Sequence, residues 1–383
     1  MKEKAVFGWV WVCMSVITIQ AEEVATVVFG GLIVTMEPGA PAPIENGWMS
    51  ISEEGRILEI GSGAVPESIV ARETIDAGGK IIIPGFISAH SHLWSAPFRG
   101  IASESNLYDW IGAAHMPFYP YYEKGDFYNY TLFGGLDFLS HGITACYNWV
   151  SNNGYDYDHW MEHLEAQLDM EQRFILGWAM DTTESDAVNR ERLEAYLERA
   201  ETLKESHPNM LGVSLSAVGL LQGDTDIPFK EGKLMQDYQL DAQVHYLEAP
   251  NVKHQQHNEF AILKASGMLC DQLHFAHFIH TTDQILEESV AAGVRMAWNP
   301  LSNGRLASGL ADIPKYQRLG LRIGMGARWP SEWGSFRSIR EYANGDVCHS
   351  YEIRVCSGHD PVSCVSHAHN RECCYAECGR SYW

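Results

Sequence analysis

Short apolar runs alternate with amphipathic stretches along most of the chain after residue 80. Residues 189–205 carry leucines and alanines at three- and four-residue spacing, which is typical of a helix. Residues 281–293 form another such stretch, and Thr281 with Gln284 predicts a capping box at its start. The apolar runs are candidate strands at residues 80–92, 142–149, 173–180, 210–219, 240–249, 273–280, 294–303 and 321–327.

This alternation predicts the fold class. Strands that alternate with helices and are buried on both faces form parallel βα units. Eight such units predict an α/β protein with a closed, TIM-type (β/α)8 barrel, whose active site lies at the carboxyl ends of the strands. The barrel domain is expected to span residues 81–330.

The pattern before the barrel is different. Residues 25–36 and 47–61 are β-type runs separated by a turn-rich segment, residues 37–47. They predict a small antiparallel sheet within a β domain over residues 22–80.

The first 21 residues resemble a secretory signal. Two lysines precede an apolar stretch of about fifteen residues, and small Ala21 is followed by two glutamates. The stretch is short for a membrane span. We therefore expect a signal peptide at residues 1–21 and a secreted or periplasmic protein. An uncleaved anchor or a mistranslated upstream start is the alternative.

Charge narrows the choice of partners. The formal net charge is −22 at pH 7, so phosphate groups would be repelled rather than neutralised. Nucleic acid is excluded as a partner, and so is an anionic membrane once the signal is removed. A small-molecule substrate fits better, and a homo-oligomer is compatible with the sequence, which does not set the oligomeric state.

Histidines gather at the ends of three predicted strands. His90 and His92 stand two residues apart, so both side chains project to one side of an extended chain, an arrangement that suits a divalent metal. His245 is followed three residues later by Glu248, a carboxylate able to move a proton. His277 on the sixth strand is expected to face the barrel interior, whereas a lone strand histidine is more often a core residue.

These motifs resemble the amidohydrolase superfamily, and within it the branch of cytosine, guanine, adenosylhomocysteine and triazine aminohydrolases and chlorohydrolases. The resemblance covers residues 25–326. It is carried by GKIIIPGFISAHSHL, FRGIASESNLYDWI, LSHGITACYN, VHYLEAP, HFAHFIHTTDQILEESVAAGVRMAWNPLSNGRLASG and GLRIGMG.

The resemblance implies one Zn or Fe ion bound by His90, His92 and His245, with Glu248 as the proton donor to the leaving side. It implies that His277 orients the substrate or the attacking hydroxide. Two-metal relatives use a lysine on the fourth strand, and residues 210–219 contain none. One metal is therefore expected.

Two further positions are candidates for substrate binding. Asn303 matches the family's seventh-strand loop, where it shapes the site or is an ordinary turn residue. Trp94, together with Phe98 and Trp110, could flank a planar ring or simply pack the first loop and helix.

The family pattern breaks at the eighth strand. Arg328 and Trp329 stand where the resemblance implies Asp-Gly, and an arginine cannot bind a cation. The codons GAT-GGN, read one base out of register after a C, become CGA-TGG, which encode Arg-Trp. We therefore interpret residues 331–383 as the product of a frameshift, natural or from sequencing.

The alternative interpretation is that residues 331–383 are a genuine part of the protein. Cysteines crowd this tail, at Cys348, Cys356, Cys364, Cys373, Cys374 and Cys378. Three disulfides would suit an exported protein, or residues 364–374 could hold zinc.

The sequence thus predicts a metal-dependent hydrolase of non-peptide carbon–nitrogen bonds that deaminates a heterocyclic small molecule through metal-activated water. The alternative is a catalytically impaired or inactive amidohydrolase without its strand-eight aspartate. Chloride or acyl amide leaving groups are compatible with the same residues.

Overall fold

The computed structural model describes residues 22–37, 39, 42–151, 157–221 and 223–327. The predicted signal peptide and the tail from Arg328 onward lie outside the described residues, so both stay predictions. The described chain forms two compact units, one ending at Pro84 and one beginning at Gly85. In the part of the chain that is described, we find no helix long and apolar enough to cross a membrane.

The first unit is a mixed five-stranded sheet. Its strands are β1 (Glu22–Ile33), β2 (Ile44–Ile51), β3 (Ile57–Ser62), β4 (Ile69–Asp76) and β5 (Ile81–Ile82). Antiparallel pairing joins β1 to β2 and β2 to β3, whereas β4 and β5 both pair with β1 in parallel.

The prediction of an antiparallel sheet is therefore confirmed for β1, β2 and β3 and wrong for β4 and β5. The single β-type run predicted at residues 47–61 divides into β2 and β3, and the turn at Ser52–Gly55 joins them in a hairpin, in which the Ser52 N–H donates to the Arg56 carbonyl. The chain then crosses over, because the backbone edge of β1 opposite β2 is still free to accept β4. Apolar alternation does not encode which edge a later strand takes.

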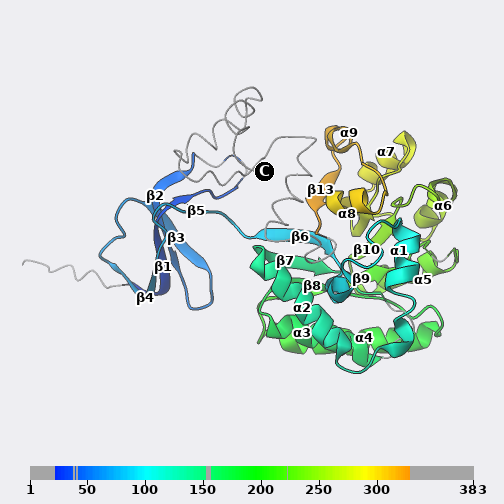
Figure 1. Cartoon of the computed structure of the whole chain (residues 1–383), viewed down its shortest axis with the longest axis horizontal. Coiled ribbons are helices and arrows are strands. Elements are labelled where there is room, and N and C mark those ends of the chain that lie inside the picture. Colours follow the sequence, from blue (N-terminus) through cyan, green and yellow to red (C-terminus); the bar gives the residue numbers. More distant parts are fainter. Residues whose placement is uncertain (1–21, 38, 40–41, 152–156, 222, 328–383) are drawn as a thin grey trace, which may run out of the picture. The chain divides into compact units, whose positions relative to one another are not determined.

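The second unit is an eight-stranded parallel sheet surrounded by helices (Figure 1). Its strands follow chain order: β6 (Phe86–Ser91), β7 (Ile143–Asn148), β8 (Arg173–Trp178), β9 (Met210–Ala217), β10 (Ala242–Tyr246), β11 (Leu273–His277), β12 (Arg295–Trp298) and β13 (Arg322–Met325). All eight predicted strands are present.

The helices connect these strands. They are η1 (Leu93–Phe98), α1 (Leu107–Ala114), η2 (Tyr119–Tyr121), α2 (Asp126–Ser140), α3 (Tyr157–Asp169), α4 (Asp186–Lys204), α5 (Ile227–Tyr238), α6 (Lys253–Ala265), α7 (Asp283–Ala291), α8 (Pro300–Arg305) and α9 (Ile313–Arg318). The helix predicted at 189–205 corresponds to α4, which begins after an N-cap serine, Ser185.

The predicted capping box of α7 is wrong by one residue. Thr282, not Thr281, is the N-cap, and its hydroxyl accepts a hydrogen bond from the Ile285 N–H at 3.2 Å. Thr281 instead donates to the carbonyl of Thr282. Two adjacent threonines offer the same chemistry, and the backbone that leads out of β11 decides which one caps the helix.

The two ends of the sheet meet, which confirms the (β/α)8 barrel. Strand β13 contacts β6, and the Ala327 N–H donates to Ser88 Oγ at 2.9 Å. Glycine is needed at this closure: a Cβ at Gly326 would lie 2.1 Å from Asn299 Oδ1 and 3.1 Å from the His90 carbonyl oxygen. The closure therefore lies beside the first predicted metal ligand.

A second close approach holds α2 against the segment after His92. A Cβ at Gly134 would lie 2.3 Å from the backbone oxygen of Leu93. We expect Gly134→Ala to lower the free energy of unfolding by about 1–3 kcal/mol, because backbone must shift to admit the methyl group. Chemical denaturation measures this change.

Gly112→Ala is the matched control, since Gly112 lies in helix α1 and, apart from the helix backbone itself, no atom lies within 4 Å of the added Cβ. It should stabilise by roughly 0.5–1 kcal/mol, as alanine does in an open helix position. Equal effects of the two substitutions would contradict the close approach.

Candidate active site

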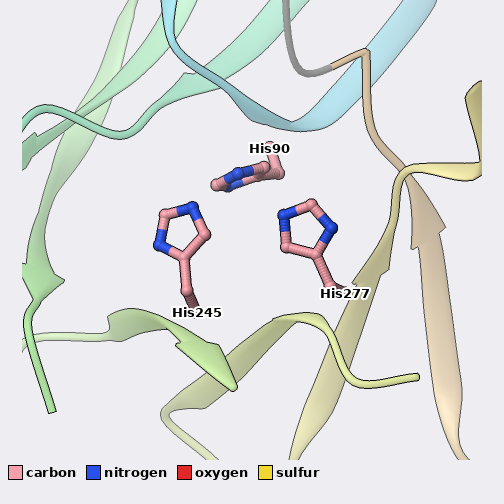
Figure 2. Close-up of side chains that lie close together, drawn as sticks. All are labelled: His90, His245 and His277. Atoms are coloured by element: carbon pink, nitrogen blue, oxygen red, sulfur yellow. The ribbon is translucent and has the colours of Figure 1, made fainter. Parts of the chain in front are cut away.

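Three buried histidines from three strands of the barrel converge at the carboxyl ends of those strands (Figure 2). His90 comes from β6, His245 from β10 and His277 from β11, and one nitrogen of each lies within 4.8 Å of the others. The side chains are at most 6% exposed. The structure thus brings together residues separated by up to 187 positions, at the edge where a barrel carries its active site.

His92, the second histidine of the H-x-H motif, adjoins this group. Its Nε2 lies 3.1 Å from the Nε2 of His245, and the two rings are stacked with centroids 5.1 Å apart. Two imidazole nitrogens at this distance either share a proton or face a common cation. The predicted set of His90, His92 and His245 and the geometric set with His277 therefore overlap in one cluster of four rings.

In three of the four rings, the nitrogen that points away from the cluster, Nδ1, is hydrogen-bonded to an acceptor. The Nδ1 atoms of His90 and His277 lie 2.6 Å from the Gln243 and Asn303 side-chain oxygens, and that of His92 lies 3.0 Å from the Trp149 carbonyl oxygen. A proton on Nδ1 leaves the Nε2 lone pair directed into the cluster. This is the arrangement in which neutral histidines bind a metal.

The donor set therefore fits a divalent cation. Imidazole nitrogens suit zinc and iron alike, and buried rings with fixed tautomers need little rearrangement to bind. The assignment of His90, His92 and His245 as ligands stays a prediction.

Glu248 lies beside the cluster, as the H-x-x-E motif predicts. It is 4% exposed, and its Oε2 is 3.5 Å from the His277 Nε2. Leu247, just before it, has a positive φ of 54°, which turns the chain sharply out of β10. His277 itself has a φ of 73°, a strained conformation for a residue with a Cβ, and strain of this kind gathers at functional sites.

The two predicted substrate-binding residues have different surroundings. Asn303, on α8, accepts a hydrogen bond from His277, so it holds that ring in place. Trp94 packs within an aromatic cluster: its ring centroid lies 4.8 Å from that of His115, which also contacts Phe98 and Trp110 at 5.3 and 4.4 Å. Both contacts to substrate stay predictions.

Tyr108 was missed by the sequence analysis. This half-exposed side chain lies on α1, and its pKa is raised, first by burial and then by the negative charge of Glu248. The phenol therefore lies close enough to the Glu248 carboxylate for the negative charge to raise its pKa. A tyrosine on an amphipathic helix carries no sequence signal for such a position.

Gln243 and Trp149 were missed as well. Both are buried, and the indole N–H of Trp149 donates to the backbone oxygen of Gln243 at 2.9 Å. Only the two-residue periodicity of a strand could have indicated Gln243. It precedes His245 by two residues and therefore lies on the same side of the strand. Arg328, which stands at the predicted fourth ligand position, lies outside the described residues.

Comparison with known proteins identifies the family. Residues 81–348 match the model of the amidohydrolase family. The chain belongs to this family. A 5-methylthioadenosine/S-adenosylhomocysteine deaminase from Desulforudis audaxviator is 26% identical over 283 residues, which cover 72% of this chain and 63% of that protein. A 5'-deoxyadenosine deaminase from Methanocaldococcus jannaschii is also 26% identical, over 72% of this chain and 65% of that one.

Solved structures share the fold. A guanine deaminase from C. acetobutylicum superposes with a TM-score of 0.71 at 19% identity, covering 84% of this chain and 79% of the deaminase. An atrazine chlorohydrolase from Arthrobacter aurescens TC1, complexed with zinc and atraton, gives a TM-score of 0.65 at 19% identity, covering 82% and 72%. The chain spans less than two thirds of the length of the two deaminase relatives named above.

Glu231 is a buried carboxylate at the carboxyl end of β9. It lies on α5, is 2% exposed, and accepts hydrogen bonds from the Val218 and Gly219 N–H groups at 2.6 and 2.9 Å. Burial raises its pKa to about 7, against the opposing effect of the two N–H groups. The carboxyl group therefore fastens the loop that follows β9.

This pKa predicts a pH dependence of stability. The folded state holds the Glu231 proton more tightly than the unfolded chain, so the stabilisation is complete below about pH 4.5 and is lost as pH rises through about 7. A difference of this size corresponds to about 3 kcal/mol. We expect Glu231→Gln to flatten the fall in unfolding free energy across this range, measured by urea denaturation.

Glu191→Gln on the exposed face of α4 is the control and should leave the pH profile as it is. If the profile of the Glu231 variant also matched that of the unaltered protein, the raised pKa would be refuted.

Proposed function

We propose that this chain is a metal-dependent hydrolase that deaminates a heterocyclic small molecule, with an aminopurine nucleoside as the first candidate. The observation that carries the proposal is the convergence of three buried histidines with Glu248 3.5 Å from one of them. The names of the two sequence relatives, both deaminases of adenosine derivatives, support the substrate class.

The histidine cluster would hold the cation, through His90, His92 and His245, with His277 close enough to contribute. A divalent ion there would lower the pKa of a water molecule toward neutrality and polarise the bond under attack. Zinc is the first candidate because the chlorohydrolase of the same fold was solved with zinc, and iron is the alternative for the same donors.

Glu248 would move the protons of the reaction. Water adds to the ring carbon that bears the amino group, and the carbon–nitrogen bond then breaks to release ammonia. One water proton ends on the ring nitrogen and the other on the departing amine. A carboxylate beside the cluster can accept each proton from water and deliver it. The His277 Nε2, 3.5 Å away, can accept a hydrogen bond from the carboxyl group while that group holds the proton.

The surroundings suit a neutral ring. The phenol of Tyr108 stands near Glu248, where it could contact a planar substrate or hydrogen-bond to it. The large negative net charge disfavours phosphorylated nucleotides and so favours nucleosides and free bases.

Metal analysis and ammonia release test the proposal. Purified protein loaded with Zn²⁺ or Fe²⁺ is assayed with 5'-methylthioadenosine, 5'-deoxyadenosine, S-adenosylhomocysteine and guanine. We expect Glu248→Gln to lower ammonia release by about 10²- to 10⁴-fold while the metal content is unchanged, since the carboxylate transfers protons and does not bind the metal.

Glu198→Gln, on the exposed face of α4, should have no effect on either measurement. The proposal fails if the protein binds neither metal, or if Glu248→Gln retains full activity.

An impaired enzyme is the second candidate, and one sequence observation favours it: Arg328 stands where the family resemblance implies an aspartate. An arginine repels a cation and supplies no base. We expect Arg328→Asp to raise metal occupancy and ammonia release at least about tenfold. A carboxylate ligand that adds about 1.4 kcal/mol to the free energy of metal binding has that effect.

Arg328→Ala separates the two causes, because it removes the charge without supplying a carboxylate. An increase with alanine alone would point to repulsion. Stoichiometric metal and full activity in the unaltered chain would show that Arg328 is tolerated, and would remove this second candidate.

A further inference from the structure

A buried glutamine connects the strand of His90 to the strand of His245. Gln243 is 1% exposed and lies on β10, two residues before His245. Its side-chain Oε1 is 2.6 Å from the Nδ1 of His90, and its Nε2 donates to the Ala89 carbonyl oxygen at 2.8 Å. Both ends of the amide are therefore hydrogen-bonded to β6.

These two contacts determine where the proton of His90 resides. A backbone carbonyl only accepts hydrogen bonds, so the NH₂ end of the amide must face Ala89. The oxygen end then faces His90, and an amide oxygen also only accepts. The Nδ1 of His90 must be the donor, and its Nε2 carries the lone pair when the ring is neutral.

We propose that Gln243 is a positioning residue that holds His90 in its Nδ1-protonated form, with the Nε2 lone pair presented to the cation. A neutral amide is sufficient for this role, because it supplies a donor to the Ala89 carbonyl oxygen and an acceptor to the His90 Nδ1. This inference rests on the metal site of the proposed function.

Trp149 extends the same network to the second histidine of the motif. Its carbonyl oxygen accepts from the His92 Nδ1 at 3.0 Å, which sets the tautomer of that ring by the same logic. Its indole N–H is bonded to the Gln243 backbone, and its ring meets His92 and His245 edge to face, at 5.2 and 4.6 Å. One connected set of hydrogen bonds therefore fixes two of the four rings, His90 and His92, and the Trp149 ring packs against a third, His245.

The first test measures Zn²⁺ affinity by competition with a chromophoric chelator, with no substrate present. Gln243→Leu keeps the volume but leaves the His90 N–H without an acceptor, and we expect the dissociation constant to rise 10- to 100-fold. Gln243→Glu should retain most of the affinity, because a protonated carboxyl group can donate to Ala89 and accept from His90.

Gln172→Leu is the matched control. Gln172 is equally buried, at 1% exposure, and donates to the Ile143 carbonyl at the opposite end of the strands. It should destabilise the fold but leave the Zn²⁺ dissociation constant within about threefold of the unaltered protein. Equal losses of affinity for the two leucine variants, or none for Gln243→Leu, would overturn the inference.

The second test needs no change at Gln243 and no bound metal. In the metal-free protein labelled with ¹⁵N-histidine, long-range ¹H–¹⁵N spectra distinguish the two tautomers of each ring. We expect the His90 signal, assigned by its loss in His90→Gln, to show a protonated Nδ1. A protonated Nε2 would overturn the inference, whereas failure to bind Zn²⁺ at all would refute only the proposed function.

Discussion

Placing four imidazole rings in the interior of a barrel is the constraint on which the rest of the site depends. A buried polar group is stable only when it is hydrogen-bonded. Here a glutamine, an asparagine and a backbone carbonyl accept from His90, His277 and His92. Each of these acceptors comes from a segment far along the chain from its histidine, 153 residues away for Gln243, 26 for Asn303 and 57 for Trp149. The site therefore exists only when the strands have closed in the correct register.

The contacts that close the barrel also position the first strand of the site. Gly326 packs against the backbone of His90, and Ala327 donates to Ser88 on the same strand. The positive φ angles of Leu247 and His277 show that the chain accepts local strain where side chains must converge. Such strain persists because the close packing around it leaves no alternative.

Several buried groups around the mouth of the barrel position backbone rather than react. Glu231 fastens the loop after β9, and Trp149 connects β7 to β10. The aromatic side chains around His115 pack η1 against the end of α1. A rigid frame of this kind keeps catalytic groups within the small tolerances that proton transfer needs.

The amino-acid sequence by itself determined the eight strands of the barrel, helix α4, the H-x-H pair and the H-x-x-E pair, because periodicity and short spacing are local properties. Family membership followed from the same motifs. Only the tertiary structure decided the mixed order of the first sheet, the capping of α7 by Thr282 and the place of His277 beside His90. It alone revealed Gln243, Trp149 and Tyr108 as neighbours of the site. Their partners lie far away in the chain, 153 residues in the case of Gln243 and His90. Contacts of that range arise from strand register and barrel closure, which no local pattern records.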